Sequence, residues 1–179
     1  MSGTFARGMF RRKGGRMGNG MRGIRAIAVA LLLASGAAPG FAGGAEDQVL
    51  SLINKARAAK GCGALVMNDK LSAAARGHAS AMAKQNFFSH TGKDGSRFSG
   101  RIKAQGYSYQ TAAENIGAGY KSPEAAVKGW MASSGHRRNI LNCRMTETGI
   151  AMVYQADDQP IKGNPYALHY YWVQVFAKP

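Results

Sequence analysis

The sequence predicts an α+β domain in which helices cover both faces of a β-sheet. Segments with helical periodicity come first along the chain, and two segments rich in Val, Ile, Tyr and Trp come last. The final segment, LHYYWVQVFA, has apolar residues at successive positions, so both faces of that strand are expected to be buried. A sheet built on such a strand needs a covering layer on each side.

The first helix is expected over residues 46–60. Val49, Leu50 and Ile53 fall on one face of it, with acidic residues at its start and basic residues near its end, as the helix dipole favours. The glycines on either side of Cys62 end this helix.

A second helix is expected over about 69–86. Its apolar stripe has spacings of three and four residues and includes Leu71, Ala74, Ala75, His78 and Met82. His78 therefore points towards the core, where we interpret it as a hydrogen-bonded packing residue rather than a ligand.

The middle of the chain alternates loops and short helices. A loop with a turn at Asp94-Gly95 leads into a short helix over 97–106. The glycines of the following AENIGAGY suit close backbone approach rather than a regular helix. The sequence Ser-Pro-Glu at 122–124 marks the start of a further helix, which runs to about Ala132.

The last third is expected to form a loop and then a hairpin. GHRRNILN is interpreted as a loop or short turn. The segments 147–155 and 168–177 have strand character and are separated by a loop containing Pro160, Gly163 and Pro165. No internal repeat is found.

The first 42 residues are interpreted as a secretory signal peptide. An apolar stretch over 26–38 follows several basic residues and precedes small ones, and a segment beginning at Met21 has ordinary signal proportions, so translation is expected to start there. The domain would then span 43–179 and lie outside the cytoplasm, with periplasm, cell wall and medium left open. The apolar stretch is short for a membrane span.

The net positive charge of the predicted domain favours binding to an anionic partner. Residues 1–42 hold seven of the 24 Lys and Arg and none of the nine Asp and Glu, which leaves 17 basic against nine acidic residues and a net charge of +8. An anionic cell-envelope surface is a suitable partner. Nucleic acid is not expected, because neither a basic helix nor an aromatic-basic recognition pattern is present.

The two cysteines, Cys62 and Cys143, both lie after the signal segment. An even number in an exported chain favours a disulfide over two separate buried thiols. The bridge would close a loop for which the chain-entropy model gives roughly 4–5 kcal/mol as an upper figure.

Several motifs in one order resemble a known family. The chain contains FFSH, AENI, a tryptophan followed by GHRRNIL, then TETGIAMV and YYWVQVF. This combination resembles the CAP superfamily, or SCP-like domain, in its compact bacterial form, over about residues 47–177. The resemblance implies a three-layer α-β-α sandwich with a largely antiparallel central sheet and a cleft on one side.

The resemblance also implies which residues line that cleft. Many members have two histidines and two glutamates there, and His90, Glu114 and His136 match three of them. The fourth position, three residues after Trp130, holds Ser133 in place of an acid. Glu147 is the nearest candidate to replace it, although we expect it at a strand start, where it would cap backbone or pair with a neighbouring arginine.

We expect a secreted binding or interaction module rather than an enzyme, with a lipid, glycan or protein ligand. Ser133 and Asn115 are expected at its cleft beside the two histidines and the glutamate, Asn115 bracing backbone. No cofactor is required. A divalent metal such as Zn²⁺ or Mg²⁺ would bind weakly at His90 and His136, because two imidazoles give only two nitrogen ligands.

Two alternative functions are considered, one that uses the same cleft and one that uses the positive charge of the surface. A metal-dependent hydrolase would employ Glu114 as the base, or a serine near the histidines as nucleophile, although no elbow, zinc-protease or triad motif is present. Alternatively, positive charge would lead binding. The basic residues fall in two groups, which are Arg137, Arg138 and Arg144, and Arg97, Arg101 and Lys103. Both groups are interpreted as solvated faces.

Overall fold

The computed structural model describes residues 44–179, so the expected signal peptide at 1–42, with its start at Met21, lies outside the described residues. The elements in chain order are α1 (Ala45–Lys60), β1 (Val66–Met67), α2 (Asp69–Lys84), α3 (Phe98–Ala104), β2 (Thr111–Ala118), α4 (Pro123–Ala132), α5 (Ser134–Ile140), β3 (Glu147–Tyr154) and β4 (Tyr170–Lys178). No helix in this part of the chain has the length and apolar character needed to cross a membrane.

The strands form one sheet in the order β1-β3-β4-β2. β4 pairs antiparallel with both β2 and β3, whereas the two-residue β1 pairs parallel with β3. The sheet is therefore mixed but largely antiparallel, as the family resemblance implied. The expected terminal hairpin of β3 and β4 is confirmed.

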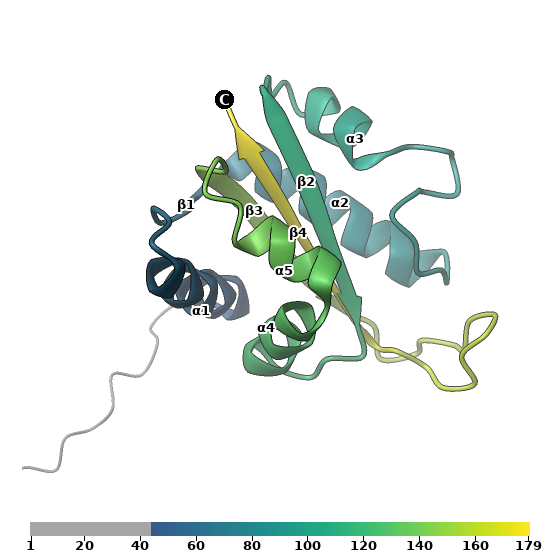
Figure 1. The fold of residues 1–179 in the computed structure, drawn as a ribbon. Coiled ribbons are helices and arrows are strands. Elements are labelled where there is room, and N and C mark those ends of the chain that lie inside the picture. The colour runs from purple at the N-terminus through teal and green to yellow at the C-terminus, as the bar shows by residue number, and fades with distance from the viewer. Residues whose placement is uncertain (1–43) are drawn as a thin grey trace, which may run out of the picture. The chain divides into compact units, whose positions relative to one another are not determined.

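Helices cover both faces of this sheet. In Figure 1, α2 runs behind the strands while α4 and α5 lie in front of them. The central strand β4 divides its side chains between the layers, because successive residues of a strand point to opposite faces. Val173 and Val175 are buried in the core under α2, whereas Trp172 and Phe176 are buried in the core under α1 and α4. The three-layer α-β-α sandwich is confirmed.

A very close contact between layers occurs at Gly149 of β3. A Cβ atom at this position would lie 2.0 Å from the backbone carbon of Leu71 in α2. Only a residue without a side chain lets the helix lie this near the strand. The α2 layer is thereby seated directly on the sheet.

Most expected helices are found at their predicted positions. α4 begins as its sequence indicated, with the Ser122 hydroxyl accepting from the Ala125 N–H at 3.2 Å and Pro123 in the first turn. His78 lies in the core as predicted, at 1% exposure.

Two segments differ from the sequence-based expectation. AENIGAGY, for which the sequence argued only against a regular helix, forms most of strand β2, which the sequence analysis did not assign and which pairs with β4 over eight positions. Close approach does occur there, since a Cβ on Gly117 would lie 3.0 Å from the Trp130 ring nitrogen. GHRRNILN, expected to be a loop or short turn, forms helix α5, which is anchored by the fully buried Ile140. In both segments tertiary packing outweighs weak local preference.

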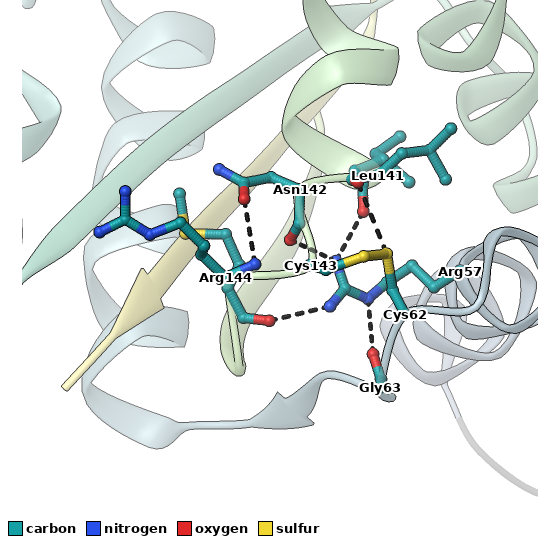
Figure 2. Close-up of a disulfide and its surroundings, with 9 residues drawn as sticks. Arg57, Cys62, Gly63, Leu141, Asn142, Cys143 and Arg144 are labelled. Atoms are coloured by element: carbon teal, nitrogen blue, oxygen red, sulfur yellow. Dashed lines mark hydrogen bonds between the residues drawn. A yellow bond between two sulfur atoms is a disulfide. The ribbon is translucent and has the colours of Figure 1, made fainter.

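A disulfide and an arginine hold α1 to the segment after α5. Cys62 and Cys143 are bonded, with their Cα atoms 4.8 Å apart, which confirms the expected bridge. Beside it, the Arg57 guanidinium is fully buried, and burial lowers its pKa. It donates to backbone carbonyls at 2.7–3.0 Å, which are those of Gly63, Ile140, Asn142 and Met145 (Figure 2).

Candidate functional site

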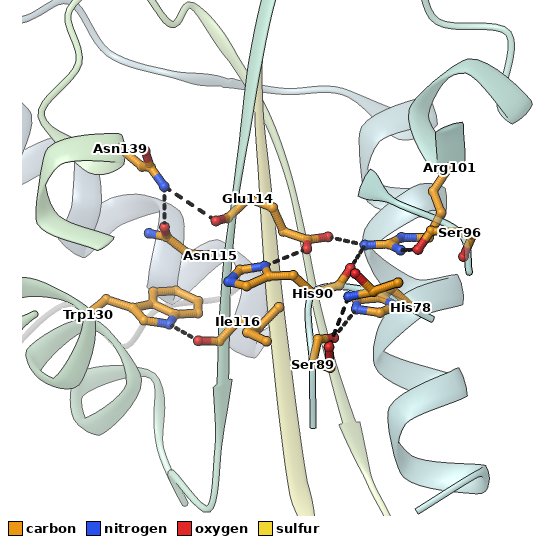
Figure 3. A network of polar contacts seen from close by, with 11 residues as sticks. His78, Ser89, His90, Ser96, Arg101, Glu114, Asn115, Ile116, Trp130 and Asn139 are labelled. Atoms are coloured by element: carbon orange, nitrogen blue, oxygen red, sulfur yellow. Dashed lines mark hydrogen bonds and ion pairs between the residues drawn. The ribbon is translucent and has the colours of Figure 1, made fainter. Parts of the chain in front are cut away.

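The candidate site is built around β2, an edge strand of the sheet. Because β2 side chains alternate between faces, Glu114 points to the α2 and α3 side and Asn115 to the α4 and α5 side. Figure 3 shows Glu114 extending towards His90 and Arg101, and Asn115 extending the other way towards Asn139. Neighbouring residues of one strand therefore serve two polar clusters.

Both oxygens of the Glu114 carboxylate are occupied. Its side chain is 1% exposed, Oε1 lies 2.9 Å from His90 Nδ1, and Oε2 accepts from Arg101 Nη2 at 2.8 Å. Since a carboxylate only accepts, His90 Nδ1 carries the hydrogen. The buried negative charge is thus compensated by two donors, which is the condition for burying a carboxylate at low cost.

Arg101 is a member of this site that the sequence analysis placed elsewhere. The expectation that Arg101 belongs to a solvated basic face is wrong, because its side chain is only 12% exposed. Its guanidinium also donates to the backbone carbonyls of Ser96 and His90 at 2.9 and 3.0 Å. The helical spacing gave a signal, since Arg101 follows Phe98 by three residues and precedes the buried Ile102.

On the other face of β2, amides connect the strand to α5. Asn115 is fully buried, and its Nδ2 donates to the His136 carbonyl at 3.2 Å. Asn139 donates to Asn115 Oδ1 at 2.9 Å and to the Glu114 carbonyl at 3.3 Å. Asn115 thus braces backbone.

His136 contacts the site through its backbone and its electrostatics. No hydrogen bond joins the His136 ring to His90 or Glu114 within residues 44–179. Burial lowers the pKa of His136, and the nearby charge of His90 lowers it further. His136 therefore lies within electrostatic reach of His90.

The serines near the histidines have structural roles. Ser133 is both the C-cap residue of α4 and the N-cap residue of α5, and its backbone carbonyl accepts from the Arg137 N–H at 2.9 Å. The Ser89 hydroxyl accepts from the Thr91 N–H at 3.1 Å. In the described part of the chain, no serine hydroxyl is hydrogen-bonded to a histidine ring. The contact that would activate a serine nucleophile is missing from this arrangement.

Glu147 lies away from these clusters, at the start of β3. Its Oε2 accepts from Asn68 Nδ2 at 2.7 Å and from the Tyr107 hydroxyl at 2.9 Å. Burial raises the pKa of Tyr107, and the hydrogen bond to Glu147 raises it further. Glu147 therefore ties strand to helix and loop, with Asn68 and Tyr107 in place of the expected arginine.

A shallow hollow opens beside Glu114, which we name the edge depression. It has a volume of about 330 Å³ and is lined by His90, Phe98, Ala112, Ala113, Glu114 and Asn139. The lining combines apolar walls with a histidine, a carboxylate and an amide. This mixture is typical of sites that bind a ligand by contact and orient it by a few polar groups.

The residues of the site do not fit a metal ion as they are arranged. No group of three or more His, Cys, Asp or Glu side chains suited to a metal occurs in residues 44–179. The Glu114 carboxylate would have to release His90 or Arg101 to act as a ligand. Zn²⁺ would then have fewer protein ligands than its usual tetrahedral sites offer, and Mg²⁺ would lack oxygen ligands. Weak metal binding stays a prediction.

Comparison with known proteins agrees with this fold. The model of the cysteine-rich secretory protein (CAP) family matches residues 50–176. The chain is 41% identical over 117 residues to the uncharacterized protein YkwD of Bacillus subtilis, covering 65% of this chain and 45% of that protein. The chain therefore spans less than half the length of this relative.

Solved structures show the same architecture. An extracellular protein containing an SCP domain from Bacillus anthracis has a TM-score of 0.63 and 26% identity, over 75% of this chain and 40% of that one. An outer surface protein from Borrelia burgdorferi has a TM-score of 0.65 and 19% identity, over 75% of this chain and 92% of that one. The chain belongs to the CAP family of SCP-domain proteins, as its motifs indicated.

Proposed function

We propose that this protein is an extracytoplasmic binding or interaction module, which recognises a lipid, glycan or protein through the edge depression and the His90-Glu114-His136 region. The observation that supports this most directly is the state of Glu114. Both carboxylate oxygens are engaged by donors, and the contact with Nδ1 holds His90 in a fixed orientation at the rim of the edge depression. Such a site is better suited to binding a ligand than to catalysing a reaction.

A positively charged surface supports the same proposal. Arg137 and Arg138, both exposed, line a groove of about 570 Å³ with Asn142 and Cys143. Exposed positive charge speeds association with an anionic envelope and makes it sensitive to salt. The edge depression would then supply the contacts that do not depend on ionic strength.

Co-sedimentation with peptidoglycan and with phosphatidylglycerol vesicles tests the proposal. The domain is mixed with each at low and high salt, as wild type and as His90→Ala. The control is Tyr166→Ala, at a residue 77% exposed in the loop before β4. Binding to either material that persists at high salt, is weakened by His90→Ala and is unchanged in the control supports recognition by the edge depression. Equal binding by His90→Ala contradicts recognition by the edge depression, and absence of binding to both materials contradicts a lipid or peptidoglycan ligand.

A further inference from the structure

A second hollow, separate from the edge depression, lies between α2, α3 and the loop that joins them. We name it the helix pocket. It has a volume of about 320 Å³, and its lining includes His78 from α2 and Arg101 from α3. This volume is at the lower end for small-ligand sites and is far larger than the roughly 30 Å³ of a single water. It has room for a ring-sized molecule.

His78, one of the residues that line this pocket, has a buried ring nitrogen without a partner among residues 44–179. Its Nε2 lies 2.9 Å from the Ser89 carbonyl oxygen, which can only accept, so Nε2 carries the hydrogen. Nδ1 of the neutral ring is therefore an acceptor, and it is buried without a partner in the described chain. Burial lowers the pKa of His78, which favours the neutral ring. Buried polar atoms are nearly always hydrogen-bonded, so a donor from a bound molecule would satisfy this one, whose residue is 1% exposed.

Arg101 presents the complementary group. Its terminal nitrogens are bonded to Glu114 and to the carbonyls of Ser96 and His90, which fixes the guanidinium plane. Its Nε–H remains buried without a partner among residues 44–179. The helix pocket is thus lined by one residue with a spare acceptor and one with a spare donor. A hydroxyl group both donates and accepts, so it matches this pair.

The remaining polar groups favour a neutral ligand. The positive charge of Arg101 is already balanced by Glu114. The rim adds one cation, Lys93, and one anion, Asp94, together with the Ser96 hydroxyl. A pocket with paired charges and mixed donors and acceptors suits a molecule with several hydroxyls better than an anion or a cation.

Two glycines keep this pocket open. Gly77 in α2 and Gly100 in α3 both line it, and a Cβ at either would meet no atom within 4 Å. Glycine is less favourable than alanine within a helix, and here no packing contact requires it. Any larger side chain at these positions would project into space that a ligand can fill.

We propose that the helix pocket binds a neutral sugar, whose hydroxyls accept from Arg101 Nε and donate to His78 Nδ1. The two hydrogen bonds would satisfy both orphaned atoms. The site is distinct from the edge depression and does not depend on the function proposed for it. The ligand class is a pyranose unit, free or at the end of an extracytoplasmic glycan.

Titration of the ¹⁵N-labelled domain with glucose and with N-acetylglucosamine tests this proposal. A ligand of this size in a small polar pocket is expected to have a dissociation constant on the order of 1 mM. The amide signals of Gly77 and Gly100 should shift saturably with at least one sugar. Inorganic phosphate serves as the anionic comparison and should not reproduce the shifts.

The matched variants are Gly100→Leu and Gly135→Leu. Gly135 is also a helical glycine whose Cβ would meet no atom within 4 Å, but it lies on α5 and does not line the pocket. Gly100→Leu should weaken sugar binding by about tenfold or more by filling the space, whereas Gly135→Leu should leave it unchanged. No saturable shift with either sugar, equal affinity in Gly100→Leu, or the same response to phosphate overturns the proposal. Neither variant alters His90, so the result is independent of the sedimentation test.

Discussion

Two buried arginines, Arg57 and Arg101, show one residue type bonded in two different ways in two regions of the molecule. Arg57 has no carboxylate partner within residues 44–179, and three of its nitrogens donate to four backbone carbonyls. Arg101 pairs with Glu114, and its Nε–H is left without a partner in the same range. An arginine with every nitrogen bonded to backbone holds segments together, whereas the spare donor of Arg101 is the group on which the proposed sugar site rests.

The comparison predicts the largest loss of stability for Arg57→Met. Removing the guanidinium leaves buried carbonyl groups without donors, so the free energy of unfolding should fall by about 3 kcal/mol or more. Urea denaturation of the oxidised protein measures this. Arg138→Met, at an exposed arginine, is the control and should change stability by less than about 0.5 kcal/mol. A loss below about 1 kcal/mol for Arg57→Met would show that the carbonyls find other donors.

A smaller loss of stability is expected for Arg101→Met. The free energy of unfolding should fall by about 2 kcal/mol, because Glu114 keeps His90 as one donor. The change leaves a buried carboxylate with less compensation. Adding Glu114→Gln should therefore recover part of the loss, and the double-mutant cycle should give a coupling of about 1 kcal/mol. Additive losses would mean that the pair contributes through packing alone. The same denaturation assay applies.

The smallest effect concerns pH. Burial lowers the pKa of both His78 and His136 below the usual 6.5. The unfolded chain therefore takes up protons first as pH falls, so stability should be constant above about pH 7 and decrease from about pH 6.5 downwards. Melting temperatures between about pH 7.5 and about pH 5.5 measure this slope. His136→Gln should reduce the slope, and an unchanged slope in that variant would contradict its assignment.

The fold was largely predictable because its strongest signals are local. Ser122 and Pro123 defined the start of α4, and the apolar run that includes Tyr171 to Phe176 defined a strand buried on both faces. β2 was missed because its residues are small and its pairing with β4 joins segments far apart in sequence. α5 was missed because its only fully buried anchor, Ile140, sits at its last position.

For the candidate site, the sequence predicted which residues belong to it better than it predicted the contacts between them. The family motif indicated His90 and Glu114, and the structure places them in contact. The motif gave no indication that Arg101 would donate a hydrogen bond to the second oxygen of the Glu114 carboxylate, since Arg101 lies among other basic residues on a short segment. The unused atoms of His78 and Arg101 depend on three-dimensional neighbours, so no local pattern reports them.

The order of the strands determines when the domain can fold. β4 lies between β2 and β3, yet it is the last of the four to be synthesised. Until it emerges, β2 and β3 have no strand to join them, although the short β1 can pair with β3. Long-range pairing of this kind is slow and exposes strand edges meanwhile. The domain should therefore acquire its tertiary structure only after residues 170–178 are available, in one late step rather than progressively during synthesis.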